Sequence, residues 1–164
     1  SLMYYEFQKG MISAIGDLEW VKMTAQPHPS ESAESIEAIR SWSESNGYQN
    51  IRFGEPGSYS SVVANADVVL CEFPSTTLLE ALWAGVPVIL YQLSGAYELV
   101  DRYFEELGDA IHMVSNSAEL IEVLANLRNG CNVSMCQFAK AEALIVGRVS
   151  GFSGEHQLWQ SILK

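Results

Sequence analysis

The segment 66–91 constrains the fold of this chain more than any other part of it. It has the sequence ADVVLCEFPSTTLLEALWAGVPVILY, in which two apolar runs flank a hydroxyl-rich turn, an apolar helical pattern and a glycine. Apolar runs without alternation are typical of strands buried on both faces, and a helix between two such strands makes them parallel. The segment therefore predicts a strand–helix–strand unit whose helix opens near Ser75 and stops at Gly85.

Hydroxyl groups and one carboxylate mark the start of that helix as a candidate anion site. Ser75, Thr76 and Thr77 follow the first strand, where unpaired N–H groups and the helix dipole favour an anion such as a phosphate. Glu80 lies about one turn later, where its carboxylate can accept hydrogen bonds from a ribose diol. The same residue types also suit an ordinary N-cap and first helical turn, so nucleotide binding is a hypothesis at this point.

The rest of the chain alternates between helix and strand patterns. We expect strands at 20–26, 51–53, 66–71, 86–91 and 111–114. We expect helices at 3–15, from an N-cap at Ser30 to about 46, around 62–63, 75–84, 100–107 and 120–127, and in most of 133–164. The alternation predicts a doubly wound, Rossmann-like α/β fold, with a mostly parallel sheet covered by helices on both faces and one domain over residues 1–164.

Composition and charge exclude several classes of function. Twenty acidic against nine basic residues give a net charge of −11, which argues against a nucleic-acid partner. Three cysteines without a C-x-x-C pair indicate neither a disulfide framework nor a zinc site. The sequence has no cluster of carboxylates near Ser75, so we expect no metal ion there. No apolar run approaches the roughly 20 residues of a membrane span, and no secretion signal is recognisable, so we expect a cytoplasmic location and no transmembrane segment.

Together with the motifs Pro27-His28-Pro29 and Gly54-Glu55-Pro56, segment 66–91 resembles a known family. The set is similar to the C-terminal, nucleotide-sugar-binding domain of GT-B glycosyltransferases, in the bacterial surface-polysaccharide and capsule type with "HP" and "S/T" motifs. The similarity covers roughly residues 19–127. It implies one half of a GT-B architecture, with the acceptor-binding N-terminal domain outside this chain. We therefore expect the C-terminal half of a longer enzyme, inactive alone.

The resemblance also implies roles for particular residues. In such enzymes the corresponding positions bind the donor phosphates (Ser75, Thr76, Thr77), the ribose (Glu80) and the nucleobase (Gly54, Glu55). His28 would be the catalytic group, stabilising the charge that grows as the sugar–phosphate bond breaks. Relatives commonly carry a lysine shortly before the His-Pro pair, whereas this chain has Gln26 there, and its nearest lysine is Lys22.

The implied function is transfer of a sugar, or of a glycerophosphoryl group, from a nucleotide-activated donor to an acceptor hydroxyl in surface-polysaccharide or glycoconjugate synthesis. The expected partners are that donor, bound as a substrate without a cofactor or metal, and the N-terminal domain; the full-length enzyme could associate peripherally with a membrane. Two alternatives stay open. An epimerase-type isomerase also binds a nucleotide-sugar but needs acid/base carboxylates, and a non-catalytic α/β interaction module would use Ser75 and Glu80 only structurally.

Overall fold

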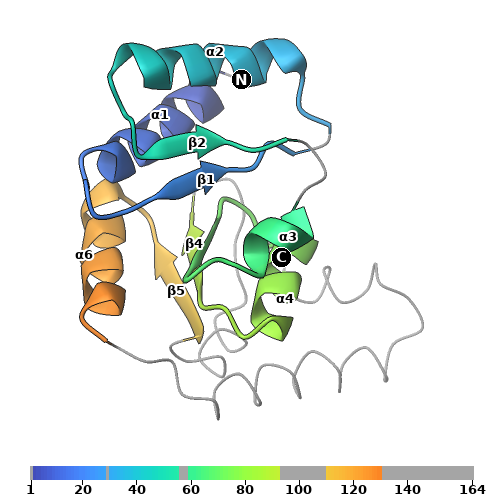
Figure 1. Ribbon diagram of the computed structural model, residues 1–164, viewed down its shortest axis with the longest axis vertical. Coiled ribbons are helices and arrows are strands. Elements are labelled where there is room, and N and C mark those ends of the chain that lie inside the picture. Colours follow the sequence, from blue (N-terminus) through green and yellow to red (C-terminus); the bar gives the residue numbers. More distant parts are fainter. Residues whose placement is uncertain (1, 29, 56–58, 93–109, 131–164) are drawn as a thin grey trace. The chain divides into compact units, whose positions relative to one another are not determined.

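A computed structural model describes residues 2–28, 30–55, 59–92 and 110–130 (Figure 1). The chain divides into two compact units, Ser1–Asn65 and Ala66–Lys164, and each contains parallel strands and helices. The predicted α/β class with parallel strands is confirmed. The helices expected at 100–107 and 133–164 lie outside the described residues. Within the described part, no helix is both long and apolar enough to cross a membrane.

The first unit packs two helices against a two-stranded parallel sheet. Its elements are α1 (Leu2–Gly16), β1 (Met23–Ala25), α2 (Ala33–Ser45), β2 (Ile51–Phe53) and α3 (Tyr59–Val63). Met23 of β1 pairs with Ile51 of β2, and Ile51 is buried with Ile12 of α1 and Ile39 of α2. Burial of apolar surface by these three isoleucines is what holds α1 and α2 on the sheet.

The strand β1 is shorter than the expected strand at 20–26 because the residues before it form a turn fixed by Asn50. The Asn50 Nδ2 atom lies 3.0 Å from the carbonyl oxygen of Ile15, 3.1 Å from that of Leu18 and 3.1 Å from that of Val21. Its own carbonyl accepts the N–H of Met23 at 2.9 Å. One amide group thus satisfies the backbone between α1 and β1, and regular pairing starts only at Met23.

Helix α2 begins two residues later than predicted. Its N-cap is Ser32, whose hydroxyl accepts the N–H of Ser35 at 3.2 Å, and not Ser30. Ser30 instead contacts the ring of His28 through both its hydroxyl and its N–H. The expected end of the helix at Asn46 and Gly47 is confirmed, with Asn46 as the C-cap.

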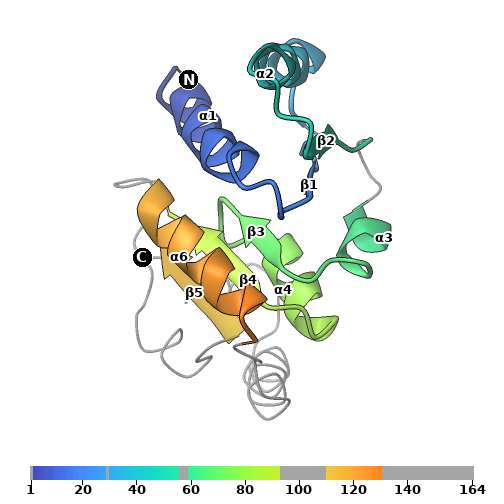
Figure 2. The ribbon, with the colours of Figure 1, turned by 60° about the vertical axis from the view of Figure 1, so that its left-hand side comes forward.

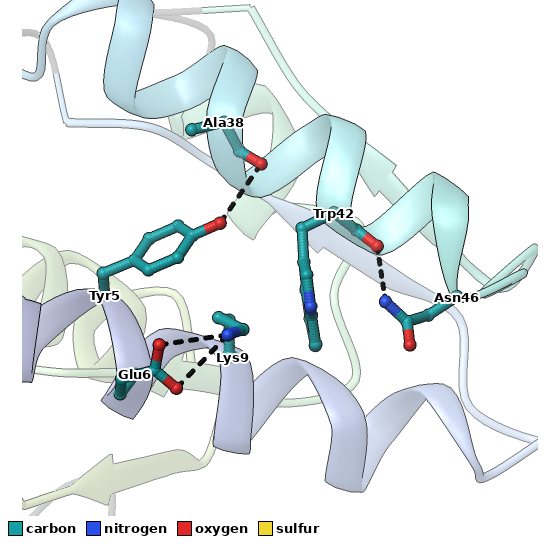
Figure 3. A network of polar contacts seen from close by, with 6 residues as sticks. All are labelled: Tyr5, Glu6, Lys9, Ala38, Trp42 and Asn46. Atoms are coloured by element: carbon teal, nitrogen blue, oxygen red, sulfur yellow. Dashed lines mark hydrogen bonds and ion pairs between the residues drawn. The ribbon is translucent and has the colours of Figure 1, made fainter.

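A charged side chain also joins α1 to α2 (Figure 3). The ammonium group of Lys9 lies 5.2 Å from the centre of the Tyr5 ring and 5.3 Å from that of Trp42, while the Glu6 carboxylate is 3.0 Å away. The Tyr5 hydroxyl donates to the carbonyl of Ala38 on α2 at 3.4 Å. Cation–π attraction to two rings therefore adds to the apolar contact between these helices.

In the described residues of the second unit, a three-stranded parallel sheet lies between two helices (Figure 2). Its elements are β3 (Val69–Cys71), α4 (Thr76–Trp83), β4 (Val88–Tyr91), β5 (Ile111–Val114) and α6 (Ser117–Arg128). The strand order is β3-β4-β5, and all four residues of β4 are buried. Helices α4 and α6 cover opposite faces of this sheet. The strands predicted around 66–71, 86–91 and at 111–114 and the helices at 75–84 and 120–127 are thus confirmed.

Helix α6 starts directly after β5 because its first turn is capped in both directions. The Asn116 side chain accepts the N–H of Glu119 at 3.0 Å. The Glu119 carboxylate accepts the N–H of Ser115 at 2.8 Å and its hydroxyl at 3.0 Å. These hydrogen bonds hold the pKa of Glu119 below its ordinary value, and the bond from the Ser115 backbone has the largest effect. The arrangement is a capping box displaced by one residue.

The glycine that ends α4 gives a stability prediction. Gly85 has φ +73°, and the N–H groups of Gly85 and Val86 donate to Leu82 and Ala81 at 3.1 and 2.9 Å, as in a Schellman motif. A Cβ at Gly85 would meet nothing within 4 Å, so the cost of a side chain is conformational. We expect Gly85→Ala to lower the free energy of unfolding by about 1 kcal/mol.

The matched control is Gly10→Ala in the interior of α1, where a Cβ also meets nothing within 4 Å. There the helix favours alanine, so the free energy of unfolding should rise by about 0.5–1 kcal/mol. Urea unfolding followed by circular dichroism measures both. Two changes of the same sign would contradict the prediction.

Candidate functional site

The start of α4 has N-cap geometry without the usual cap. Ser75 occupies the N-cap position in extended conformation, and Thr76 and Thr77 form the first turn. Ser32 and Asn116, at the starts of α2 and α6, accept capping hydrogen bonds with their side chains, whereas the Ser75 side chain makes none. Side-chain capping therefore does not account for the serine at this position. The start of a helix is a position at which backbone N–H groups can bind a ligand anion.

Burial separates the two faces of α4. Leu78, Leu79, Ala81 and Leu82 are buried, and α4 contacts β3 and β4. Thr76 and Glu80 are both exposed and are four residues apart, which places them on one face of the helix. The structure thus brings the hydroxyl-rich turn and the candidate ribose carboxylate together at one solvent-facing helix end.

The end of β3 and the loop that follows it contain one buried thiol and one exposed aromatic side chain that the sequence did not single out. Cys71 is buried, and burial together with the charge of Glu72 raises the pKa of its thiol to about 12. A buried thiol that stays protonated is a poor nucleophile. Phe73, two residues before Ser75, keeps 43% of its surface exposed. The sequence signal that could have identified Phe73 is its residue type, because it is an aromatic residue in a turn otherwise made of polar and small residues.

His28 lies in the segment that follows β1, and Ser30 orients its ring. The Nδ1 atom lies 2.7 Å from the hydroxyl of Ser30 and 3.2 Å from its backbone N–H. A backbone N–H can only donate, so Nδ1 is the acceptor and Nε2 carries the hydrogen of the neutral ring. The exposed imidazole can therefore offer an N–H donor to an anionic ligand.

Gly54 and Glu55 follow β2 and are tied to the segment after β1. The Gly54 N–H donates to the carbonyl of Ala25 at 2.9 Å, and the Gln26 side-chain amide donates to the carbonyl of Glu55. The neutral side chain at position 26 is therefore engaged with the backbone. The carboxyl ends of parallel strands lie at the same edge of a sheet, so the first unit presents His28, Gly54 and Glu55 at one edge.

The candidate residues thus fall into two groups. His28, Gly54 and Glu55 belong to the first unit, and Ser75, Thr76, Thr77 and Glu80 to the second. Every one of them follows the carboxyl end of a parallel strand, where α/β proteins bind their ligands. Over the described ranges, no three His, Cys, Asp or Glu side chains gather into a group that could hold a metal ion.

Short parallel strands with helices place the chain in the α/β class, which includes many enzymes. The chain belongs to a transferase family, because residues 2–115 match the family model described as LIC12162 family transferase. The match covers more than half of the chain and contains every candidate residue, and it confirms the prediction of a transferase. No curated protein and no solved structure matches the chain.

Proposed function

We propose that this chain binds the nucleotide part of an activated sugar donor, as the Rossmann-like C-terminal half of a GT-B glycosyltransferase. The start of α4 carries the proposal, because Ser75, Thr76 and Thr77 follow a buried parallel strand and Glu80 shares the exposed face of Thr76. The helix N–H groups and hydroxyls would bind the phosphates. The Glu80 carboxylate would accept hydrogen bonds from the ribose diol. Membership of a transferase family agrees with this reading.

The remaining roles in the proposal belong to residues of the first unit. The backbone of Gly54 and Glu55 contacts the nucleobase. The Nε2–H group of His28 donates to the leaving phosphate and stabilises the charge that develops on it. Hydroxyls, amide dipoles and an imidazole would stabilise the leaving group, so the proposal includes no metal or cofactor.

The proposal also includes a second domain and a biological setting. An N-terminal domain, outside this chain, would bind the acceptor hydroxyl and supply the general base. The transfer would serve bacterial surface-polysaccharide or capsule synthesis, in the cytoplasm or at the inner surface of the membrane.

Calorimetric titration with UDP, CMP, CDP and GDP tests the proposal. One of these nucleotides should bind selectively, and Ser75→Ala and Glu80→Ala should each weaken its binding about tenfold. Ser75→Ala removes a hydroxyl that donates to a charged phosphate, and Glu80→Ala removes a carboxylate that accepts from the ribose hydroxyl groups. The matched control is Glu122→Ala, which removes an exposed carboxylate from α6 and should leave affinity unchanged within about twofold.

Other results would point to a different binding site or to a different function. If both variants bind the nucleotide as tightly as the native chain does, the nucleotide does not bind at α4. Binding to none of the four nucleotides, by this chain and by a longer protein that contains it, would favour the interaction module. An epimerase would convert the nucleotide-sugar into an isomer without an acceptor, which product analysis distinguishes from transfer.

A further inference from the structure

Gln26 joins the segments that follow β1 and β2. Its Nε2 atom donates to the backbone carbonyl of Glu55, and its amide oxygen occupies the space that a Cβ at Gly54 would need. The side chain is half-buried between these contacts. One amide group therefore restrains two successive residues, Glu55 by a hydrogen bond and Gly54 by close contact.

These restraints bear on the peptide group between Gly54 and Glu55. On one side of it, the N–H of Gly54 is fixed by the carbonyl of Ala25 at 2.9 Å. On the other side, the carbonyl of Glu55 is fixed by Gln26. A peptide group presents a donor and an acceptor in opposite directions, so its orientation decides whether a facing base edge must offer an acceptor or a donor.

We propose that Gln26 is a positioning residue that sets which nucleobase the site accepts. The inference rests on the proposed function, in which the Gly54–Glu55 backbone contacts the base. Gln26 acts through that backbone and does not touch the ligand. Its substitution therefore changes the selectivity between bases and leaves the contacts of the phosphates with α4 in place. A side chain at position 54 would displace the Gln26 amide.

Two substitutions at Gln26 separate its hydrogen bond from its size. Gln26→Glu keeps the shape and places an acceptor against the Glu55 carbonyl, and Gln26→Met keeps the length and removes both polar atoms. In both variants the ratio of affinities for the best and second-best of the diphosphates UDP, CDP and GDP, which share their phosphates and differ in the base, should fall at least about fivefold, the change expected from one lost neutral hydrogen bond. Affinity for inorganic pyrophosphate should stay within about twofold, and ¹H–¹⁵N spectra should show shifted Gly54 and Glu55 amides.

A second test, which combines substitutions at positions 54 and 26, applies even if one of the Gln26 variants folds poorly. Gly54→Ala should reduce base selectivity in the chain that carries Gln26 and should have little further effect in Gln26→Ala, where the methyl group finds space. Additive effects would overturn the inference. So would Gln26 variants that weaken all four nucleotides and pyrophosphate by one common factor, and that result leaves the proposed function standing. A native chain that binds none of the nucleotides would overturn both, and it is recognised without any variant.

Discussion

The Asn50→Asp variant should unfold with a free energy about 3 kcal/mol lower than that of the native chain. The substitution keeps the size of the side chain and removes the donor that lies within 3.1 Å of three backbone carbonyls. It also points a carboxylate at those carbonyl oxygens, in a partly buried place where water compensates poorly. The turn between α1 and β1 then loses its restraint, and the pairing of Met23 with Ile51 loses its fixed start.

The loss should depend on pH in a defined direction. Repulsion by the carbonyls raises the pKa of the introduced carboxyl in the folded state above its value in the unfolded chain. Its charge therefore opposes folding above the folded-state pKa, and the variant recovers part of its stability, relative to the native chain, as the pH falls through that value and an O–H donor returns. Urea unfolding between pH 7 and pH 4 measures the recovery.

The matched control is Asn46→Asp. Asn46 donates one side-chain hydrogen bond, to the carbonyl of Trp42 at 2.8 Å, from an exposed C-cap (Figure 3). Loss of one exposed bond should cost about 1 kcal/mol or less. Equal losses in the two variants would show that Asn50 does not organise the turn.

His28→Ala should have the largest effect on turnover. If Nε2–H stabilises the charge on the leaving phosphate, its removal should slow the reaction by about 10²–10³, the cost of one lost transition-state donor. The affinity for the intact nucleotide-sugar should change less than about threefold, because the charge develops only as the bond breaks. The measurement is nucleotide release from the matching nucleotide-sugar, by transfer to water, in the protein that carries both domains.

Two further variants complete that experiment. His28→Gln retains a side-chain N–H and should recover part of the rate. Ser32→Ala removes the cap of α2 four residues away and should cost about 1 kcal/mol of stability without a loss of turnover. An affinity for the intact nucleotide-sugar that falls in His28→Ala as steeply as the rate would assign His28 to ground-state binding.

Sequence reasoning located the elements whose signals are local. The apolar runs 88–91 and 111–114 are strands, and Gly47 and Gly85 end helices with positive φ, because burial and left-handed backbone each leave a mark on residue type. The start of α2 was misplaced because Ser30 and Ser32 are equally good caps by type. The choice follows from the contact of Ser30 with His28, which residue types do not encode.

Some features of the candidate site likewise follow from local sequence signals, and others do not. The position of Ser75 at a helix start, and Glu80 on the same helix, follow from spacing along the chain. The absence of a capping bond from Ser75, the tautomer of His28 and the contact of Gln26 with Glu55 depend on atoms brought together by folding. The role of Asn50 could not be predicted from the sequence for the same reason, since its three acceptors lie about thirty residues earlier in the chain.

The parallel pairing of β3 with β4 has a consequence for how the protein is made. Parallel neighbours cannot be joined by a hairpin, so the chain through α4 has to become compact before these strands can meet. Until then β4, whose four residues are all buried in the folded state, is an apolar segment open to other chains. A change that delays the formation of α4 would therefore lower the yield of folded protein during synthesis, even where the folded state is as stable as before.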